Sequence, residues 1–518
     1  MCSSSGRREA AIPLRAKASG LPGGGFVKND SDRVLSLLER ALSWVEADQA
    51  EIVWQSGEDY LTRFANNVIH QNVAERSGEA RLRAVLGRKV GLASTRDLSE
   101  EGLRAAAREA AAIARLQPDN PDFKSLVSAV DVAAMAGATG SGTAGVIGSS
   151  TAGAAPAGDR SLPASAFAAP RTVAYTPEER ADAVRVVTDR AKKHGLESAG
   201  AYSTSFTQLA VANSLGVRAF TDLSDATLTA VVMSGTGSGY ADAHSRDTGR
   251  IDPAAVAQEA VEKCLANREP VGIDADEYEV ILEEYAVAEF LEYLNYLGFS
   301  ALAFQEGRSF MSGHLGQRVM DPKLTIYDDG LDAAGSPLPF DFEGVPKQRV
   351  TIIEGGVARG VVWDSFTAGR EKPPSERGTS PADGAPRGGD APRRSTGHAG
   401  LRAPFAANLF IAAGEASKQQ MLEQTERGLL ITRFHYIRPV HPTRTVVTGM
   451  TRDGTFLVEH GKIVGPVKNF RFTQSITEAF SDVRQIGRTR KTEGWMYGSV
   501  TVPALHLGRF NFTGRTDH

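Results

Sequence analysis

The sequence predicts an α+β protein of two lobes, an N-terminal duplicated α/β-hairpin domain followed by a mainly antiparallel β C-terminal domain. Two observations carry this prediction. A succession of helix, three extended segments and helix occurs twice in the first half of the 518-residue chain. From about residue 276 the pattern changes to short extended segments separated by turn signals. An apolar content of 41% is enough for sizeable hydrophobic cores.

The first repeat begins with a predicted helix at Ser31, SDRVLSLLERALSWVEA, whose apolar residues recur at helical spacing. The extended segments AEIVW, DYLTRFANNVIHQNV and EARLRAVLGRKVGLAST follow. The repeat closes with the helix SEEGLRAAAREAAAIARL, which Ser99 caps and which carries acidic residues in its first turn.

The second repeat begins at Thr176, which forms a capping-box pattern with Glu179, while Pro177 occupies the first helical position and Gly195 ends the helix. The extended segments GAYSTS, TQLAVANSLGVRAF and ATLTAVVMSGTGSGYADA follow, and then the helix DPAAVAQEAVEKCLAN. The order of elements is therefore the same as in the first repeat.

Landmarks of the two repeats keep a nearly constant separation. The helix start recurs after 145 residues, an asparagine (Asn66 and Asn213) after 147, and a glycine (Gly91 and Gly239) after 148. The run Gly235–Gly239 ends a strand at the place that residues 87–91 occupy in the first repeat. We therefore interpret it as a turn and not as a phosphate-binding loop.

Composition sets the domain boundaries. We assign residues 28–275 to the N-terminal domain and 276–518 to the C-terminal domain, after a Gly/Ser/Arg-rich tail at 1–27. Two low-complexity stretches, at about 133–171 and about 371–402, are expected to be disordered loops inserted into the domains. They hold too few large apolar residues to offset the entropy of ordering.

The C-terminal domain contains two hairpins with one shared pattern, a glutamate followed by glycines two and six positions later. The pattern begins at Glu354 and again at Glu459. The pairs Gly355–Gly356 and His460–Gly461 stand where tight hairpin turns need positive φ. These segments predict an antiparallel β domain that is closed or sandwiched.

Composition also excludes several functions. A formal net charge of -4 gives no reason to expect nucleic acid or an anionic membrane as a partner. Two distant cysteines, Cys2 and Cys264, exclude a disulfide framework and a thiolate zinc cluster. No apolar run is long enough to span a bilayer, so a cytoplasmic location is expected.

The helix EEYAVAEFLEYLNYL, which opens the C-terminal domain, carries four glutamates and no histidine. Its apolar residues form an ordinary amphipathic stripe. Carboxylates alone suit hard cations and not a hydrolytic zinc centre. We therefore expect a packing helix with an acidic face toward solvent.

Sequence blocks from both domains resemble the TldD/TldE family, whose second type is also called PmbA or modulator of gyrase. The blocks, in order, are RFANNVIHQN, VGLASTRDLS, the segment from YDDG through PFDFEGVPKQRVTIIEGGV, GLLITRFHYIRPV, TGMTRDGTFLVEHGKI and PVKNFRF. The resemblance implies a bilobal subunit that dimerises, within a system that trims or degrades peptides.

In the TldD-type subunit of this family, an H-E-x-x-x-H helix and a cysteine near the C-terminus hold zinc. Histidines five apart are about 140° out of phase on a regular helix, so that helix must be distorted. Here Leu291 and Tyr296 stand at the histidine positions and Glu292 at the glutamate. The C-terminal region has no cysteine. The resemblance thus implies a metal-free TldE-like member, with zinc expected only in a partner subunit.

The implied partners are a TldD-like zinc peptidase subunit, in a heterodimer or a larger assembly, and a peptide substrate; a homodimer is also open. Residues beside the strands could contact peptide or line the subunit interface, although internal ion pairing explains them equally well. They are Arg433, Tyr436, Arg438, Arg452 and Asp453.

Two alternatives stay open, so whether the chain is itself an enzyme is not decided. It could be an autonomous metallopeptidase with a non-standard site, built from carboxylates or from His435 and His441. It could also be a regulatory binding protein of the gyrase-modulator type.

Overall fold

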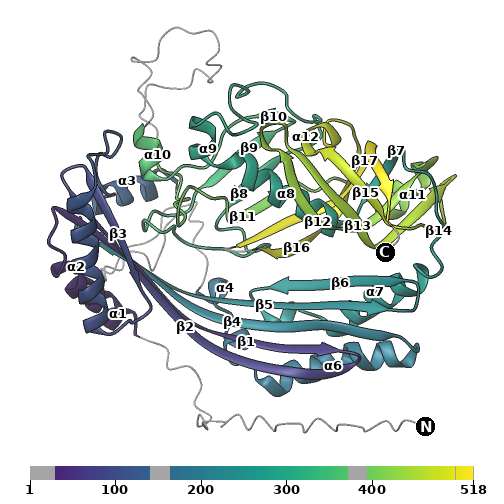
Figure 1. The fold of residues 1–518 in the computed structure, drawn as a ribbon, viewed down its shortest axis with the longest axis horizontal. Coiled ribbons are helices and arrows are strands. Elements are labelled where there is room, and N and C mark those ends of the chain that lie inside the picture. Colours follow the sequence, from purple (N-terminus) through teal and green to yellow (C-terminus); the bar gives the residue numbers. More distant parts are fainter. Residues whose placement is uncertain (1–29, 140–163, 371–393, 496–497, 517–518) are drawn as a thin grey trace, which may run out of the picture.

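The computed structural model describes residues 30–139, 164–370, 394–495 and 498–516. The predicted tail, residues 1–27, lies outside the described residues. Two lobes are stacked on one another (Figure 1): a long, curved antiparallel sheet with helices on its outer side, and a C-terminal lobe that lies over the opposite face of that sheet. The predicted α+β class with two lobes is confirmed.

The N-terminal lobe has the predicted duplication. The first repeat comprises α1 (Ser31–Ser43), β1 (Gln49–Ala65), β2 (Val68–Leu86), β3 (Lys89–Thr95) and α2 (Glu100–Leu116). The second comprises α6 (Pro177–Lys193), β4 (Glu197–Asn213), β5 (Arg218–Met233), β6 (Ser238–Ser245) and α7 (Pro253–Ala266). The sheet order β3-β2-β1-β4-β5-β6 places the first strand of each repeat at the centre, paired antiparallel, so the two repeats meet symmetrically.

The helix ends follow the predicted capping. Thr176 and Glu179 form a reciprocal capping box at the start of α6, with Thr176 N donating to Glu179 Oε2 at 2.8 Å. Ser99 Oγ accepts from the amide of Gly102 at 3.2 Å at the start of α2. These bonds satisfy amides that have no partner within the helix.

The stretch 133–171, which we expected to be a disordered loop, is helical at both ends. Helix α3 (Ala129–Thr139) covers its beginning, and α4 (Ala164–Phe167) and α5 (Pro170–Val173) cover its end; residues 140–163 lie outside the described part. Val132 and Met135 pack against Val217 and Val345 in a small core between the lobes. The helix thus has apolar contacts to both lobes, although the composition around these two residues is dominated by small side chains.

The C-terminal lobe is built on an 11-stranded, mainly antiparallel sheet. Its strands are β7 (Glu277–Leu282), β8 (Ile326–Asp329), β9 (Arg349–Glu354), β10 (Val357–Ala358), β11 (Asn408–Ile411), β12 (Arg427–His441), β13 (Val446–Glu459), β14 (Lys462–Pro466), β15 (Phe470–Ser475), β16 (Val483–Trp495) and β17 (Gly498–Arg515). Strand β7 pairs with both β12 and β17, so β17, β15, β13, β12 and β7 form a closed ring. Of the two predicted forms, closed or sandwiched, this ring is the closed one.

The helices of this lobe are α8 (Glu284–Leu294), α9 (Ala301–Gln305), α10 (Ser365–Arg370), α11 (Lys418–Gln424) and α12 (Ile476–Ala479), and a π-helical turn (Asn295–Phe299) follows α8. Helix α8 packs against the closed ring of strands through Phe290. The aromatic rings of Phe290 and Phe434 are stacked, with 4.6 Å between their centres. The predicted hairpin turns are present: Gly355 and Gly356 have φ of 53° and 75°, and His460 and Gly461 have 47° and 78°.

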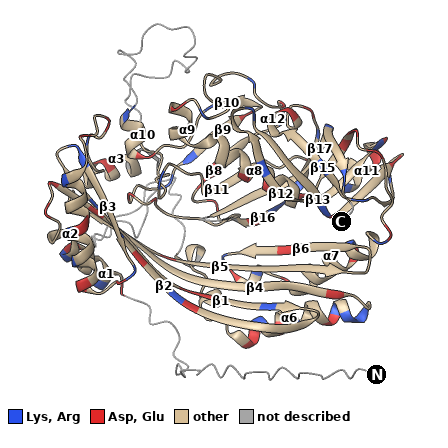
Figure 2. Cartoon of the chain, in the orientation of Figure 1, with Lys and Arg blue, Asp and Glu red and all other residues tan. Residues whose placement is uncertain are grey.

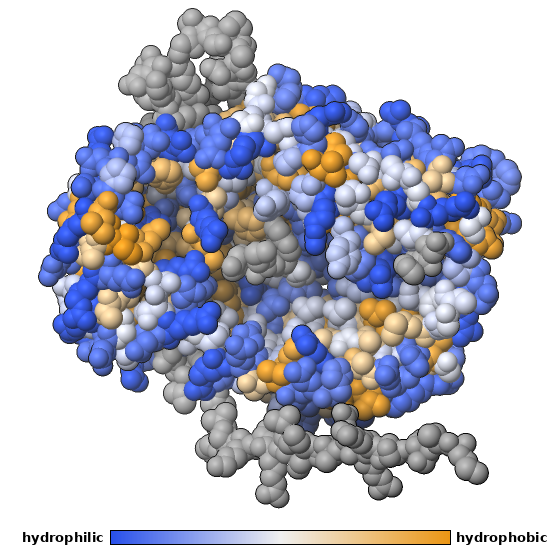
Figure 3. Space-filling model, in the orientation of Figure 1, coloured by the Kyte–Doolittle hydropathy of each residue, from blue (hydrophilic) through white to orange (hydrophobic). Residues whose placement is uncertain are grey.

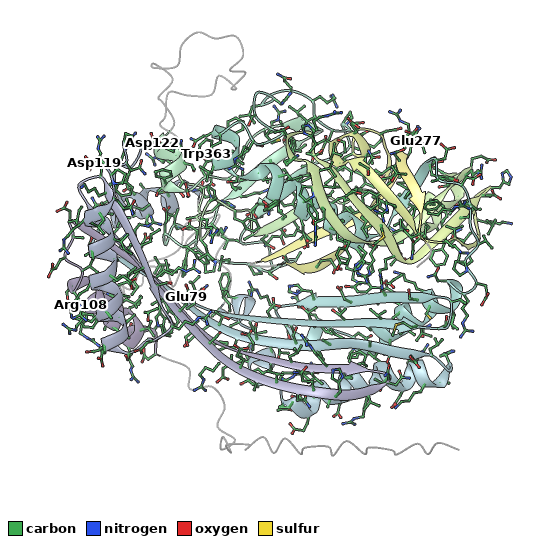
Figure 4. The ribbon with its side chains drawn as sticks, viewed as in Figure 1. Glu79, Arg108, Asp119, Asp122, Glu277 and Trp363 are labelled. Carbon is green, nitrogen blue, oxygen red and sulfur yellow. The ribbon has the colours of Figure 1, made fainter. Side chains whose placement is uncertain are left out.

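The lobes touch at several places. A loop of the C-terminal lobe inserts Phe340, which is fully buried against Leu209, Val211 and Ala219 of the N-terminal sheet. At another corner, Arg370 of α10 pairs with Asp122, which follows α2, at 3.0 Å; Figure 4 labels Asp122 and Trp363 at this corner. Acidic and basic residues are interspersed over both lobes (Figure 2). Among the described helices, none combines the length and hydropathy needed to cross a membrane.

Candidate functional site: the cavity between the lobes and helix α8

A cavity of about 770 Å³ lies between the two lobes. Its floor is the C-terminal lobe's side of the N-terminal sheet, with Thr207 and Leu209 from β4, Leu223 from β5 and His244 from β6. Its roof comes from the turn after α8 and from loops around residues 338–347 and 399–407. The surface also recedes between the lobes on the face drawn in Figure 3. The volume suits a ligand of drug or short-peptide size.

Helix α8 does not have the predicted solvent-facing acidic side. Glu283 and Glu284 are buried, and Lys418 Nζ lies 2.9 Å from Glu283 and 2.7 Å from Glu284. Lys263 of α7, in the other lobe, reaches Glu283 at 2.7 Å. Burial alone would raise the pKa of Glu283, but the two ammonium groups outweigh it and hold the pKa at about 2. Glu283 therefore joins the two lobes, while Glu284 is paired within the C-terminal lobe.

The other two glutamates of α8 face a second group of acids. The Glu289 carboxylate accepts a hydrogen bond from the amide of Phe434 at 2.9 Å. Burial raises the pKa of Glu289 and of Glu292 to about 8, and Asp242 of β6 adds to the effect on Glu292. Burial and then Asp242 raise the pKa of Glu493, from β16, well above its usual range. These carboxyl groups hold protons near neutral pH.

The three positions of the family's zinc helix are occupied in a way that does not fit zinc. Leu291 is 0% exposed and belongs to the main core of the C-terminal lobe, and it has no donor atom. Tyr296 is 69% exposed and lines the cavity. Between them, the helix changes to the π-helical turn Asn295–Phe299, which is the kind of distortion that histidines five apart require. This chain thus has a π-helical turn at this place without histidine at positions 291 and 296.

Within the described residues, no three His, Cys, Asp or Glu side chains come together closely enough to hold a metal ion. Neither His435 and His441 of β12 nor the four glutamates at α8 belong to such a group. The donor chemistry of the helix, a leucine and a phenol flanking a protonated glutamic acid, gives zinc no imidazole or thiolate.

Three of the predicted peptide-contact residues meet at the contact between the lobes. Arg433 of β12 pairs with Asp453 of β13, with 2.7 Å between Nε and Oδ2. Asp453 Oδ1 also accepts a hydrogen bond from Ser238 of β6 at 2.6 Å, and the Arg433 guanidinium lies 4.2 Å from the ring centre of Tyr240. Arg452 approaches Asp453 only to 4.0 Å.

The other two predicted residues lie apart from these. Tyr436 is 65% exposed with φ of 54°, in a part of β12 where the pairing with β13 shifts register. The Arg438 guanidinium lies 5.4 Å from its ring centre. None of the five candidates is among the residues that line the cavity.

Sequence reasoning missed the charged residues of the cavity wall. Lys347 and Asp341 lie in the segment PFDFEGVPKQRV, which we used only as a mark of the family. Behind them, Asp328 is bonded to His398 at 2.7 Å in a fully buried pair. His398 falls in the stretch 371–402 that we expected to be unstructured; residues 394–402 are described and several are buried, while 371–393 lie outside the described residues.

Comparison with known proteins defines the class of protein. Family models match in three parts: PmbA/TldA metallopeptidase domain 1 over residues 50–114, the central domain over 173–268, and the C-terminal domain over 275–514. The chain belongs to the PmbA/TldD metallopeptidase family. The predicted family is thus confirmed.

Two named relatives illustrate the similarity. The TldD metalloprotease homologue of Haemophilus influenzae is 26% identical over 44% of this chain and 45% of its own length. Metalloprotease PmbA of Escherichia coli O157:H7 is 25% identical over 38% of this chain and 39% of its own length. Each match thus spans less than half of the relative.

Solved structures share the fold over nearly the whole chain. TldE from Thermococcus kodakarensis superposes with a TM-score of 0.74 at 18% identity, covering 93% of this chain and all of its own. A protein from Thermotoga maritima, described as a proposed modulator of a DNA gyrase, gives 0.73 at 16% identity, covering 92% of this chain and 99% of its own.

Proposed function

We propose that this chain is the metal-free, TldE-like subunit of a peptidase and that it pairs with a zinc-bearing, TldD-like subunit. In this role it completes the chamber in which a peptide is held, and the partner cleaves the peptide. Zinc belongs to the partner in this proposal, and no step of hydrolysis is assigned to side chains of this chain.

The observation that carries the proposal is the state of helix α8. Its π-helical turn has the distortion that a zinc helix of this family needs, yet Leu291 is locked in the hydrophobic core and Tyr296 points a phenol at the cavity. Glu292 has a raised pKa of about 8, so below that pH it is mainly protonated and is a poor general base. The scaffold of the family's site is present without donors for the metal.

The cavity supports the peptide part of the proposal. A cavity of about 770 Å³ offers an extended segment room to bind without a metal in this chain, and Tyr436 of β12, outside the cavity, adds an exposed aromatic side chain. A buried ion pair between Lys263 and Glu283 joins the two lobes that enclose this cavity.

The test is co-expression with a TldD-like subunit that has an intact H-E-x-x-x-H helix. We expect one complex by size-exclusion chromatography with light scattering, and cleavage of unstructured peptides that this chain alone does not show. The same complex carrying a Glu→Gln change in the partner's zinc helix is the control, and it should assemble but not cleave.

A matched variant in this chain separates assembly from catalysis. Glu292→Gln should leave the cleavage rate of the complex within about twofold, because the glutamate is not the base in this account. A complex that loses activity with Glu292→Gln, or a chain that forms no complex with any TldD-like partner, contradicts the proposal.

A further inference from the structure

The wall of the cavity holds a lysine with no partner for its charge. Lys347 is 3% exposed and lines the cavity. Among the described residues no carboxylate forms an ion pair with its ammonium group, although the charges of Asp328 and Asp341 act on it. Its aliphatic stem lies against Gly330, where an added Cβ would come within 2.4 Å of Lys347 Cβ. A glycine at position 330 therefore makes room for this side chain.

The two carboxylates whose charges act on Lys347 already accept hydrogen bonds from other groups. Asp328 accepts from His398 Nε2 at 2.7 Å and from the amide of Asn408 at 2.8 Å. Asp341 accepts from the amides of Glu343 and Val345 at 2.9 Å each and of Ala399 at 2.7 Å. Burial lowers the pKa of Lys347, although both carboxylates act against that effect. A buried cation without a direct partner is costly, and a bound anion would offset that cost.

A second cation borders the same part of the cavity. Arg246, also in the wall, donates to Ser224 O at 2.7 Å and to Pro337 O at 3.2 Å, while its Nε is buried without a partner. The backbone amide of Lys347 donates to Pro339 O at 3.1 Å. The Arg246 guanidinium and the Lys347 backbone are thus bonded to one short loop, at carbonyls two residues apart. Asp225 reaches Arg246 only at 4.0 Å.

Apolar side chains of the loop and of the sheet line the same cavity as these cations. Leu338, on the loop, packs with Leu209, Leu223 and Phe342, and all four line the cavity. The wall therefore combines unsatisfied positive charge with an apolar patch. That combination matches an anion attached directly to an apolar group.

We propose that the cavity binds the C-terminal carboxylate of a peptide, with Lys347 as the anion-binding residue and the apolar patch receiving the side chain of the last residue. The inference deepens the proposed function, since it states which end of the peptide this subunit holds. It concerns binding alone and involves no covalent step.

The test compares two fluorescein-labelled pentapeptides ending in leucine, one a free acid and one a C-terminal amide, by fluorescence anisotropy with the purified chain and with its complex. We expect the free acid to bind about tenfold more tightly. Lys347→Met should reduce that preference to less than about twofold. Lys193→Met, at an exposed lysine in the last turn of α6, is the matched control and should keep the full preference.

Thermal unfolding of Lys347→Met checks the fold, and we expect a midpoint no lower than that of the parent chain because an unpaired buried charge is removed. A third peptide, amidated but ending in glutamate, separates a terminal carboxylate from a side-chain one and should bind like the leucine amide. Acetate and inorganic phosphate serve as competitors, and weak competition by both is expected.

Equal binding of acid and amide, an acid preference that survives Lys347→Met, or tight binding of the glutamate amide overturns the inference. The proposed function fails separately. If the chain prefers the free-acid peptide but forms no complex with a TldD-like subunit and supports no cleavage, only the proposed subunit role is wrong. If the complex cleaves peptides but does not prefer the free acid, only this inference is wrong.

Discussion

Ser238 of the N-terminal lobe donates a hydrogen bond to Asp453 of the C-terminal lobe at 2.6 Å. The same carboxylate, 1% exposed, pairs with Arg433, so one buried charge joins strands β6, β12 and β13. Arg433 in turn acts to lower the pKa of Glu289 on α8, against the larger effect of burial. The lobe contact and helix α8 therefore belong to one polar network.

Asp453→Asn should destabilise the chain by about 3 kcal/mol, because it leaves Arg433 without its counter-charge in a mostly buried place. Asp453 has φ of 57°, which asparagine tolerates, so the change tests the ion pair and not the backbone. Urea unfolding followed by circular dichroism measures the effect. Arg452→Gln, half exposed and 4.0 Å from Asp453, is the control and should cost less than about 0.5 kcal/mol. Equal effects of the two changes would contradict the ion-pair account.

The raised pKa of Glu292 predicts how stability depends on pH. The pKa of about 8 in the folded chain lies above the ordinary value of 4.5, so the folded state holds a proton that the unfolded state releases. The contribution of Glu292 is fully present below pH 4.5 and is lost as the pH rises to about 8.

The free energy of unfolding of the parent chain should therefore decrease between pH 5 and 8, and Glu292→Gln should make that decrease smaller. It should make the chain more stable than the parent at pH 9, on the order of 2 kcal/mol. Denaturant unfolding at a series of pH values provides the measurement. Glu277→Gln, at the exposed start of β7 (labelled in Figure 4), is the control and should leave the slope unchanged. A parent and a Glu292→Gln profile with the same slope would show that Glu292 is ionised in the folded chain.

The duplicated glycines Gly91 and Gly239 let each repeat's last helix approach its last strand. A Cβ at Gly91 would lie 2.2 Å from Ala110 O of α2, and one at Gly239 would lie 2.2 Å from Ala260 O of α7. Gly91→Ala and Gly239→Ala should each lower the free energy of unfolding by about 1–3 kcal/mol, because the backbone of the facing helix must move. Gly235→Ala is the control within the same GTGSG run, since a Cβ there meets nothing within 4 Å. Thermal unfolding distinguishes them, and a neutral Gly239→Ala would refute the packing role.

The family's two histidine positions should respond differently to histidine. Leu291→His places an imidazole in the hydrophobic core and should cost about 2–4 kcal/mol. Tyr296→His changes an exposed side chain, so its free energy of unfolding should stay within about 0.5 kcal/mol of that of the parent chain. Unfolding midpoints in urea check both. If Leu291→His were neutral, position 291 would face the cavity and the assigned register would be wrong.

Much of the N-terminal lobe could be predicted because its signals are local. Ser99 and Thr176 mark helix starts by chemistry that acts within one turn, and the recurring spacing from Gly91 to Gly239 exposes the duplication. The hairpin at His460–Gly461 was predictable for the same reason, since positive φ at a two-residue turn leaves a mark in the sequence.

The environment of α8 could not be predicted, because the burial of Glu283 and Glu289 depends on partners far along the chain. Lys418 lies 135 residues from Glu283, and Phe434 lies 145 residues from Glu289. Amphipathic spacing shows which side of a helix is apolar, but it does not show whether another lobe covers the polar side. Lys347 was missed for the same reason, since its burial in the cavity wall becomes visible only when the loops are folded.

The central claim is that this chain supplies no metal centre of its own and that catalysis belongs to another subunit. The most direct measurement is the zinc content of the isolated chain by plasma mass spectrometry, after purification without chelators and with zinc in the growth medium, alongside its activity on a peptide. We predict well below one zinc per chain and no cleavage. One tightly held zinc per chain together with peptide cleavage would contradict the account.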